Sequence, residues 1–253
     1  MIRNFDPDVN KMERLVSVLE SYRGKDRIIR LTGFVATFLA GTAKGKSALH
    51  FKTIATELAA CRTVLRLFDD TSMLMSNLVY GTGSKEPVTA LRILQLIGNF
   101  VNQLYYPVEH IAWLGSKNII NVESGKYMLF GLMIWVTSLT TEITKSLIKI
   151  RLAQIEIGSV KKQQYLEASE ERNGVTEQFQ AMSDQLKALR AKSSDAYLLL
   201  FQSMFDLMNA VNWLPPGILW SGKLSTAQSG VCGMISTGIM LYRGWPAEKD
   251  KKS

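Results

Sequence analysis

The chain has 253 residues, of which 47% are hydrophobic and 21% charged, and its mean hydropathy is close to zero at +0.04. This composition excludes a disordered chain, which combines low hydrophobicity with high charge. The net charge of +8 favours an anionic partner, either nucleic acid or an acidic membrane face. Two cysteines, Cys61 and Cys232, do not imply a disulfide framework.

The N-terminal segment is predicted to be helical, because its apolar residues recur at steps of three and four. The first helix is expected to begin with Asp6 as its N-cap and Pro7 in its first position. Gly24 is predicted to end this helix, and residues 25–42 are predicted to form the next one. The apolar stripe of the first helix consists of Met12, Leu15, Val16 and Leu19.

Residues 47–80 carry the clearest amphipathic pattern and are predicted to form one helix, ended by a turn at Gly81 and Gly83. A fourth helix is expected to follow from Pro87, and Pro107 is predicted to kink or interrupt it. The apolar face of the predicted helix at 47–80 consists of Phe51, Ile54, Leu58, Cys61, Leu65 and Phe68. The charged residues lie largely on the opposite side and are Lys52, Arg62, Arg66, Asp69 and Asp70.

Two later stretches are candidates for crossing a bilayer. Residues 127–141 are uncharged but shorter than the about 20 residues that a span needs. Such a span would carry Glu142 and Lys145 inward as a pair one turn apart, or let them snorkel. Residues 224–242 are uncharged throughout and form the stronger candidate; the alternative is a soluble packing helix. Small residues repeat there every four positions, which lets two helices approach closely in lipid: Ser225, Ser229, Gly233 and Thr237.

The predicted fold is therefore all-α: a multi-helix membrane protein with N-terminal amphipathic helices and one to two C-terminal transmembrane helices. Residues 159–194 are polar and are interpreted as a connecting segment or a solvated helix. The expected regions are an amphipathic helical part (1–115), a helix with the marginal first span (116–155), a polar connecting segment (156–194), an amphipathic helix plus the second span (195–243) and a charged tail (244–253).

The sequence gives little support to catalysis or to a metal site. Residues 41–47 imitate a phosphate-binding loop, but three residues separate the glycines where the motif needs four. Asp69 and Asp70 lack a second acidic cluster that would complete a magnesium site. His50 and His110 lack the spacing of a zinc site. We expect no enzyme activity, no cofactor and no metal, and the basic residues form no recognisable nucleic-acid module.

Four long, aromatic-rich strings carry a resemblance to a known family. They are LESYRGKDRIIRL (19–31), CRTVLRLFDD (61–70), GNFVNQLYYPVEHIAWLG (98–115) and NAVNWLPPGILWSGKL (209–224). In order and spacing they resemble the peroxisomal membrane protein eleven family (the peroxin-eleven proteins), specifically its gamma, or C, branch. The resemblance covers residues 15–155 and 195–243.

The resemblance implies a peroxisomal membrane protein that promotes peroxisome proliferation by elongating the membrane before fission. It also implies homo-oligomers or hetero-oligomers with related members, recruitment of fission adaptors and a dynamin-like GTPase, and termini in the cytosol. An N-terminal amphipathic helix remodels the bilayer in this family, and residues 51–68 match it best. The lipid contacts expected from this match are Phe51, Ile54, Leu58, Leu65 and Phe68, with the cations Lys52, Arg62 and Arg66.

Several alternatives remain open from the sequence. The face at residues 51–68 either inserts into lipid, packs on the protein's own helices, or does each in a different state. The small-residue stripe from Ser225 to Thr237 is a candidate contact for self-association. A pore or transporter for small metabolites is the alternative function, and a soluble helical enzyme or adaptor is a third. The lysine-rich tail at 249–253 resembles a dilysine retrieval signal, with a solvated tail as the alternative.

Overall fold

A computed structural model describes residues 7–170 and 177–246, and these residues form eight helices and no strand. The predicted all-α class is confirmed. Asp6 and the lysine-rich tail lie outside the described residues. The helices are α1 (Pro7–Glu20), α2 (Tyr22–Thr42), α3 (Gly45–Arg66), α4 (Asp69–Tyr80), α5 (Thr89–Ser116), α6 (Ser124–Glu170), α7 (Glu177–Asn212) and α8 (Thr226–Arg243).

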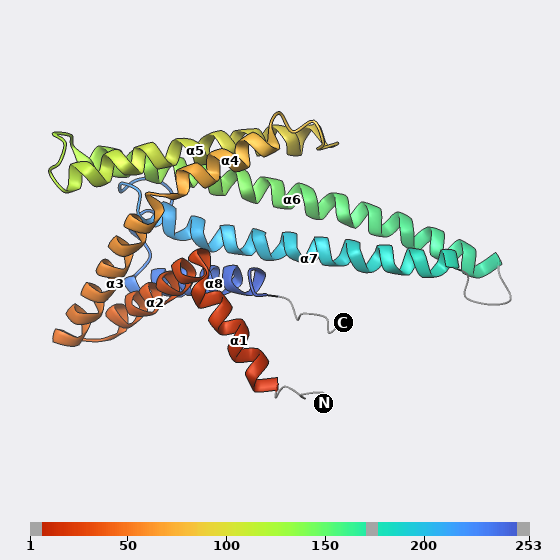
Figure 1. The fold of residues 1–253 in the computed structure, drawn as a ribbon, viewed down its shortest axis with the longest axis horizontal. Helices are drawn as coiled ribbons and strands as arrows, with labels where there is room; N and C mark the ends of the chain where they lie inside the picture. The colour runs from red at the N-terminus through yellow and green to blue at the C-terminus, as the bar shows by residue number, and fades with distance from the viewer. Residues whose placement is uncertain (1–6, 171–176, 247–253) are drawn as a thin grey trace.

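The longest helices, α6 and α7, lie side by side as a hairpin that extends away from the rest of the molecule (Figure 1). Helix α5 packs along the first part of α6, and α4 packs on α5. At the other side of the hairpin, α8 packs against both α7 and α2. Helix α2 also carries α1 and α3, so the N-terminal and C-terminal helices meet in one bundle.

The outer half of the α6–α7 hairpin contains the described part of the polar segment 156–194, and it is helical. A narrow apolar seam holds the two helices together, as expected where a helix pair buries only one stripe of each partner. The seam consists of Val160, Met182, Leu186 and Leu189 at the outer end and of Ile150, Ala196 and Leu200 nearer the body.

The junction between α1 and α2 differs from the prediction, because the break falls at Ser21 and not at Gly24. The Ser21 hydroxyl caps α2 by accepting a hydrogen bond from the Gly24 amide at 3.0 Å. Gly24 lies within α2, and a β-carbon there would lie only 1.9 Å from the carbonyl oxygen of Val18. The glycine thus permits the close turn between the two helices instead of ending the first.

The predicted helix at residues 47–80 is in fact two helices, α3 and α4, separated at Leu67 and Phe68. Phe68 has φ −109° and ψ 3°, outside helical geometry, and stands at the N-cap of α4. Asp69 and Asp70 then occupy the first turn of α4, where negative charge is favourable near the positive end of a helix dipole. The apolar spacing continues across the break, which is why it conceals the joint.

Helix α5 continues through Pro107, so the predicted interruption does not occur. On α6, the ammonium of Lys145 lies 2.5 Å from the carboxylate of Glu142, one turn away, as the charge pattern predicted. Lys145 also donates a hydrogen bond to Gln95 of α5 at 2.9 Å. The buried ammonium is therefore paired where α5 and α6 meet.

None of the helices in residues 7–170 and 177–246 combines the length and the hydropathy that a membrane span requires. The predicted span at 127–141 forms part of α6, and the predicted span at 224–242 covers the residues just before α8 and most of that helix; both stay predictions.

Candidate membrane-contact surface

The bundle of α2, α7 and α8 has a polar centre. Arg30 of α2 is only 8% exposed, and its guanidinium lies 2.5 Å from the carboxylate of Asp206 on α7. The same guanidinium donates to the hydroxyl of Ser236 on α8 at 3.2 Å and lies over the ring of Phe34 at 5.5 Å. Burial lowers the pKa of Arg30, and the charge of Asp206 opposes this effect. Three helices thus share one buried charge pair.

A second polar contact lies one turn further along α7. The amide of Asn209 donates to the backbone oxygen of Ser229 at 3.0 Å, and the Ser229 hydroxyl donates back to the amide oxygen of Asn209 at 2.8 Å. Both residues are buried. Side-chain hydrogen bonds between helices are a common means of joining helices in lipid.

The small-residue stripe of α8 lies mainly inside this bundle. Ser225 is the N-cap of α8 and forms a capping box with Gln228, whereas Ser229, Gly233 and Thr237 are buried. A β-carbon at Gly233 would lie 2.1 Å from the ring of Phe34, so only glycine permits this approach of α2. In this structure the stripe therefore packs on helices of its own chain, and a contact between copies stays a prediction.

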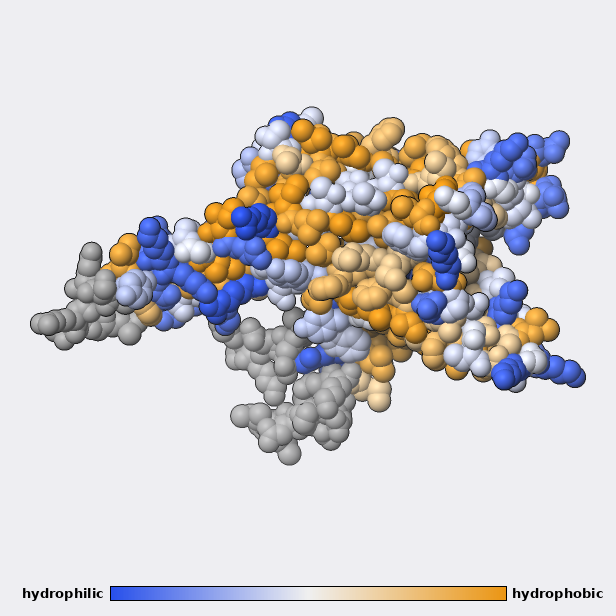
Figure 2. All heavy atoms as spheres, turned by 180° about the vertical axis from the view of Figure 1, so that it is seen from behind, coloured by the Kyte–Doolittle hydropathy of each residue, from blue (hydrophilic) through white to orange (hydrophobic). Residues whose placement is uncertain are grey.

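The outward side of α8 is apolar. Val231, Ile235 and Tyr242 are exposed, opposite the buried serines and glycines. Apolar side chains also cover much of the central surface in Figure 2, and polar side chains gather at the ends of the molecule, including the end of the α6–α7 hairpin. Polar groups inside and apolar groups outside are the distribution expected of helices that pack in lipid.

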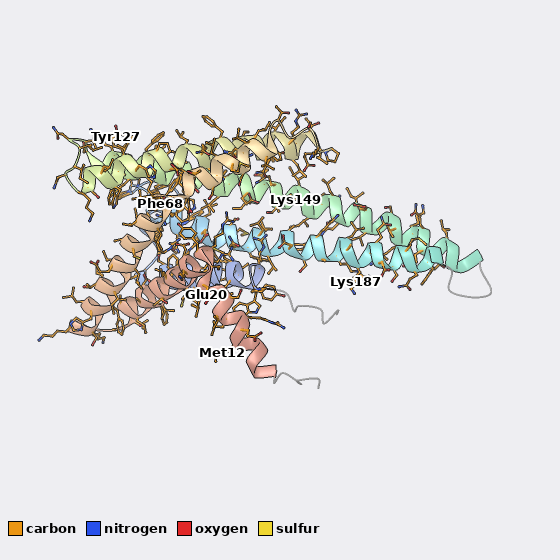
Figure 3. All side chains as sticks on the ribbon, viewed as in Figure 1. Met12, Glu20, Phe68, Tyr127, Lys149 and Lys187 are labelled. Carbon is orange, nitrogen blue, oxygen red and sulfur yellow. The ribbon has the colours of Figure 1, made fainter. Side chains whose placement is uncertain are left out.

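The predicted lipid-binding residues of the segment 51–68, apart from its two arginines, divide into two groups. Ile54, Lys52 and Phe68 are exposed, and Phe68 is 78% exposed at the joint between α3 and α4 (Figure 3). Phe51, Leu58 and Leu65 are half-buried. No described residue of α3 is fully buried, so this helix is not a core helix of the bundle.

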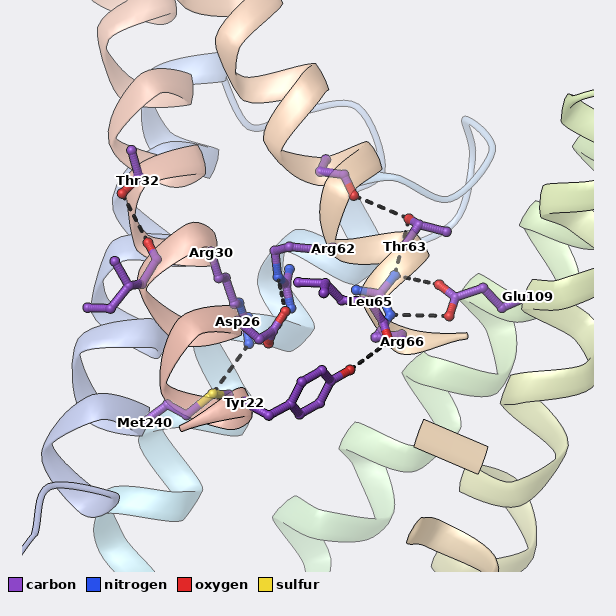
Figure 4. Close-up of polar contacts among 12 residues, drawn as sticks. Tyr22, Asp26, Arg30, Thr32, Arg62, Thr63, Leu65, Arg66, Glu109 and Met240 are labelled. Carbon is purple, nitrogen blue, oxygen red and sulfur yellow. Dashed lines mark hydrogen bonds and ion pairs between the residues drawn. The ribbon is translucent and has the colours of Figure 1, made fainter. Parts of the chain in front are cut away.

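Arg62 and Arg66 were predicted to attract acidic lipid, but the structure turns both into ion pairs within the chain (Figure 4). Arg62 binds Asp26 of α2 through its Nε and Nη2 atoms at 2.8 and 3.2 Å. Arg66 binds Glu109 of α5 through the same two atoms. The carboxylates that pair with the two arginines belong to residues far away in the sequence, so the spacing within α3 cannot reveal them.

The Arg66–Glu109 contact joins α3 to α5, and Tyr105 completes it by donating to Glu109 at 2.9 Å. Burial raises the pKa of the Tyr105 hydroxyl to about 12; Arg66 opposes this rise and Glu109 adds to it. Burial would lower the pKa of Arg66, but its hydrogen bond to Glu109 and its neighbours outweigh burial, and the pKa is raised. The guanidinium of Arg66 therefore stays charged across the physiological pH range.

Sequence reasoning missed the most exposed apolar face of this region, which lies on α4. Asn77 on the inner side of α4 donates to the side chain of Gln103 on α5 at 3.1 Å. The opposite side carries pairs of apolar residues four positions apart, a signal present in the sequence. Together with Phe68 these residues form a surface that we call the α4 patch, and each is about half exposed or more: Phe68, Leu74, Met75, Leu78 and Val79.

The fold and this surface define a class: an all-helical protein with a buried ion pair at the centre of its α2, α7 and α8 bundle and an amphipathic helix whose apolar face is turned outward. Comparison with known proteins identifies one family. The model of the family Peroxisomal biogenesis factor 11 (PEX11) matches residues 12–245, and the chain belongs to this family. The predicted family is thus confirmed, and membership accords with the predicted role in peroxisome proliferation and fission.

Two curated relatives support the predicted branch. Peroxisomal membrane protein 11C of Homo sapiens is 32% identical over 237 residues, which cover 90% of this chain and 92% of that protein. Peroxisomal membrane protein 11C of Mus musculus is 32% identical over 232 residues, covering 89% and 91%. No solved structure matches the chain.

Proposed function

We propose that this protein elongates the peroxisomal membrane by inserting the α4 patch, together with Ile54 of α3, into the cytosolic leaflet. The observation that carries the proposal is the outward apolar face of α4, a helix already folded against α5. An amphipathic helix lies about 5–10 Å deep in one leaflet and expands it relative to the other. Curvature relieves this mismatch of area.

The patch is large enough to hold the protein on a bilayer. Full burial of a side chain of this type contributes about 1.5–3 kcal/mol, and the five residues of the patch bury roughly half to three-quarters of their surface on insertion. The gross gain is on the order of 5–10 kcal/mol. Because α4 is already helical on α5, little ordering cost opposes this gain.

The half-buried part of the predicted face joins this surface only if α3 moves. Phe51, Leu58 and Leu65 reach lipid when α3 separates from α2, and Arg66 becomes available when its pair with Glu109 opens. Lys52 is exposed without such a movement. A cation next to an acidic leaflet contributes about 1 kcal/mol.

We assign the protein a multi-pass topology with spans at 127–141 and 224–242 and both termini in the cytosol. The polar centre of the α2, α7 and α8 bundle supports this assignment, because buried charge pairs and small residues join helices where lipid surrounds them. Homo-oligomers or hetero-oligomers with related members, fission adaptors and a dynamin-like GTPase are the proposed partners. Membership of the family carries this part of the proposal.

The proposal is tested with the full chain reconstituted into large vesicles that contain acidic phospholipid. The wild type elongates the vesicles into tubules, as seen by electron microscopy. Met75→Gln/Leu78→Gln removes apolar area with side chains of similar size and abolishes the tubules, whereas Ile155→Gln, an exposed site on the outer part of α6, leaves them unchanged. Equal tubulation by all three proteins contradicts the proposal.

Leakage of a trapped dye in the same vesicles separates membrane shaping from the alternative function. A membrane-shaping protein deforms the vesicles while they retain the dye. Release of a small dye without a change of vesicle shape supports a pore or transporter for small metabolites instead.

A further inference from the structure

A cavity of about 1130 Å³ separates the α2–α3 pair from the α5–α6 pair. It exists because α3 packs on α2 and α4 but contacts α5 and α6 little within the described residues. The contact between Arg66 and Glu109 bridges the gap at one place (Figure 4). The cavity exceeds the range of about 300–1,000 Å³ that is usual for pockets of drug-sized ligands.

The wall of the cavity is chiefly aromatic and aliphatic. The rings of Trp135 and Trp213 stack on each other with their centroids 5.9 Å apart, and other rings come from α2, α5 and α6. Such a wall suits a long hydrocarbon chain, which it removes from water without needing polar partners. The aromatic residues that line it are Phe34, Tyr105, Tyr106, Trp113, Tyr127, Trp135 and Trp213.

Two guanidinium groups line the α3 side of the same cavity. Arg62 and Arg66 lie one helical turn apart, and each uses Nε and Nη2 for its carboxylate partner. Within residues 7–170 and 177–246, the Nη1 group of each has no hydrogen-bond partner. Guanidinium donors in this arrangement match the oxygens of a phosphate group better than a single ammonium does.

From this combination we infer that the cavity binds one phospholipid molecule. Its phosphate lies on Arg62 and Arg66, and an acyl chain lies along the aromatic wall toward Trp135. Neither a free phosphate nor a bare hydrocarbon uses both parts of the site. This inference does not depend on membrane bending by the α4 patch, because lipid retention and vesicle shape are measured separately.

Native mass spectrometry of the full chain in detergent tests the inference. Dioleoyl phosphatidylcholine and dioleoylglycerol are offered at equal concentration, since they carry the same two acyl chains and only the first carries a phosphodiester. The expected result is one phosphatidylcholine adduct per chain and no retained dioleoylglycerol. An absence of adducts, or equal retention of dioleoylglycerol, overturns the assignment.

Variants that fill the cavity locate the bound lipid. Gly33 and Gly131 both line it, and a β-carbon at either position makes only ordinary contacts, the nearest at 3.7 Å. Gly33→Leu/Gly131→Leu is expected to lower the retained phosphatidylcholine at least tenfold. Gly158→Leu on α6 is the matched control, because nothing lies within 4 Å of a β-carbon there, and it retains the lipid. Unchanged retention in the filled variant overturns the assignment.

A measurement on the wild type covers the case in which the filled variant fails to fold. A phosphatidylcholine with a photoreactive group midway along one acyl chain is crosslinked to the protein and the labelled peptides are identified. Labels at Trp113 or Trp135 support the cavity. Labels confined to the outward apolar side chains of α8 or the α4 patch contradict it.

Discussion

Replacing Asp206 by alanine leaves the guanidinium of Arg30 buried without its carboxylate. The pair lies where α2, α7 and α8 meet, and the exposed fractions of its side chains are 9% and 6%. Removing one partner of a buried ion pair costs about 3–5 kcal/mol, because the remaining charge stays out of water. We expect Asp206→Ala to be destabilised by about this amount.

A matched pair at the surface provides the control. Arg243 binds Asp195 at 2.8 Å, but the Asp195 side chain is 59% exposed, and exposed pairs contribute about 0–1 kcal/mol. Thermal unfolding followed by circular dichroism in detergent measures both variants. For a chain of this size, 1 kcal/mol corresponds to about 2–4 °C in Tm, so Asp206→Ala is expected to lose roughly 6–20 °C and Asp195→Ala only a few degrees.

The double variant Arg30→Met/Asp206→Leu separates the ion pair from the packing around it. Apolar side chains of similar size often replace a buried ion pair without loss of stability. We therefore expect the double variant to recover most of the Tm lost by Asp206→Ala. Equal Tm values for Asp206→Ala and Asp195→Ala would refute the assignment of a polar centre to this bundle.

Three further predictions follow from the packing and the electrostatics. Gly233→Leu forces a side chain into an aromatic ring of α2 and is expected to cost about 1–3 kcal/mol or more, whereas Gly238→Leu, which faces open space, keeps the wild-type Tm. Burial raises the pKa of the Tyr105 hydroxyl from its usual value of 10 to about 12, so the neutral hydroxyl contributes its full stability below pH 10 and loses it as the pH rises toward 12. Chemical denaturation at each pH should show that the free energy of unfolding of the wild type falls by up to about 3 kcal/mol more than that of Tyr105→Phe. Glu109→Gln weakens the link between α3 and α5 by about 1.5–3 kcal/mol and is expected to increase the tubulation of vesicles that contain acidic phospholipid. Glu123→Gln, which breaks an exposed pair within one turn, should tubulate them like the wild type, and equal tubulation by both variants would show that the link does not restrain α3.

The sequence was sufficient for features that depend on local spacing. The all-α class and the pairing of Glu142 with Lys145 follow from neighbours within one or two helical turns. The joint at Phe68 was missed because apolar residues continue at helical spacing across it. Periodicity identifies the face of a helix but not the point at which its backbone bends.

Contacts between segments far apart in the sequence could not be predicted from local spacing. Asp206 is 176 residues away from Arg30, and Glu109 is 43 residues away from Arg66, so nothing near either arginine indicates its partner. The stripe from Ser225 to Thr237 identified a surface for close helix contact but not the helix that occupies it. Only the folded chain shows that α2 and α7 pack against that stripe.

The depth of the α4 patch in a bilayer tests the central claim most directly. A fluorophore is attached through Leu78→Cys, or through Ile155→Cys as control, in a Cys61→Ser background that removes the exposed native thiol. Lipids brominated at defined acyl positions then report depth by quenching. We predict strong quenching at position 78 by bromines about 5–10 Å below the headgroups and little at position 155. Equal, weak quenching at both positions would contradict insertion of the patch.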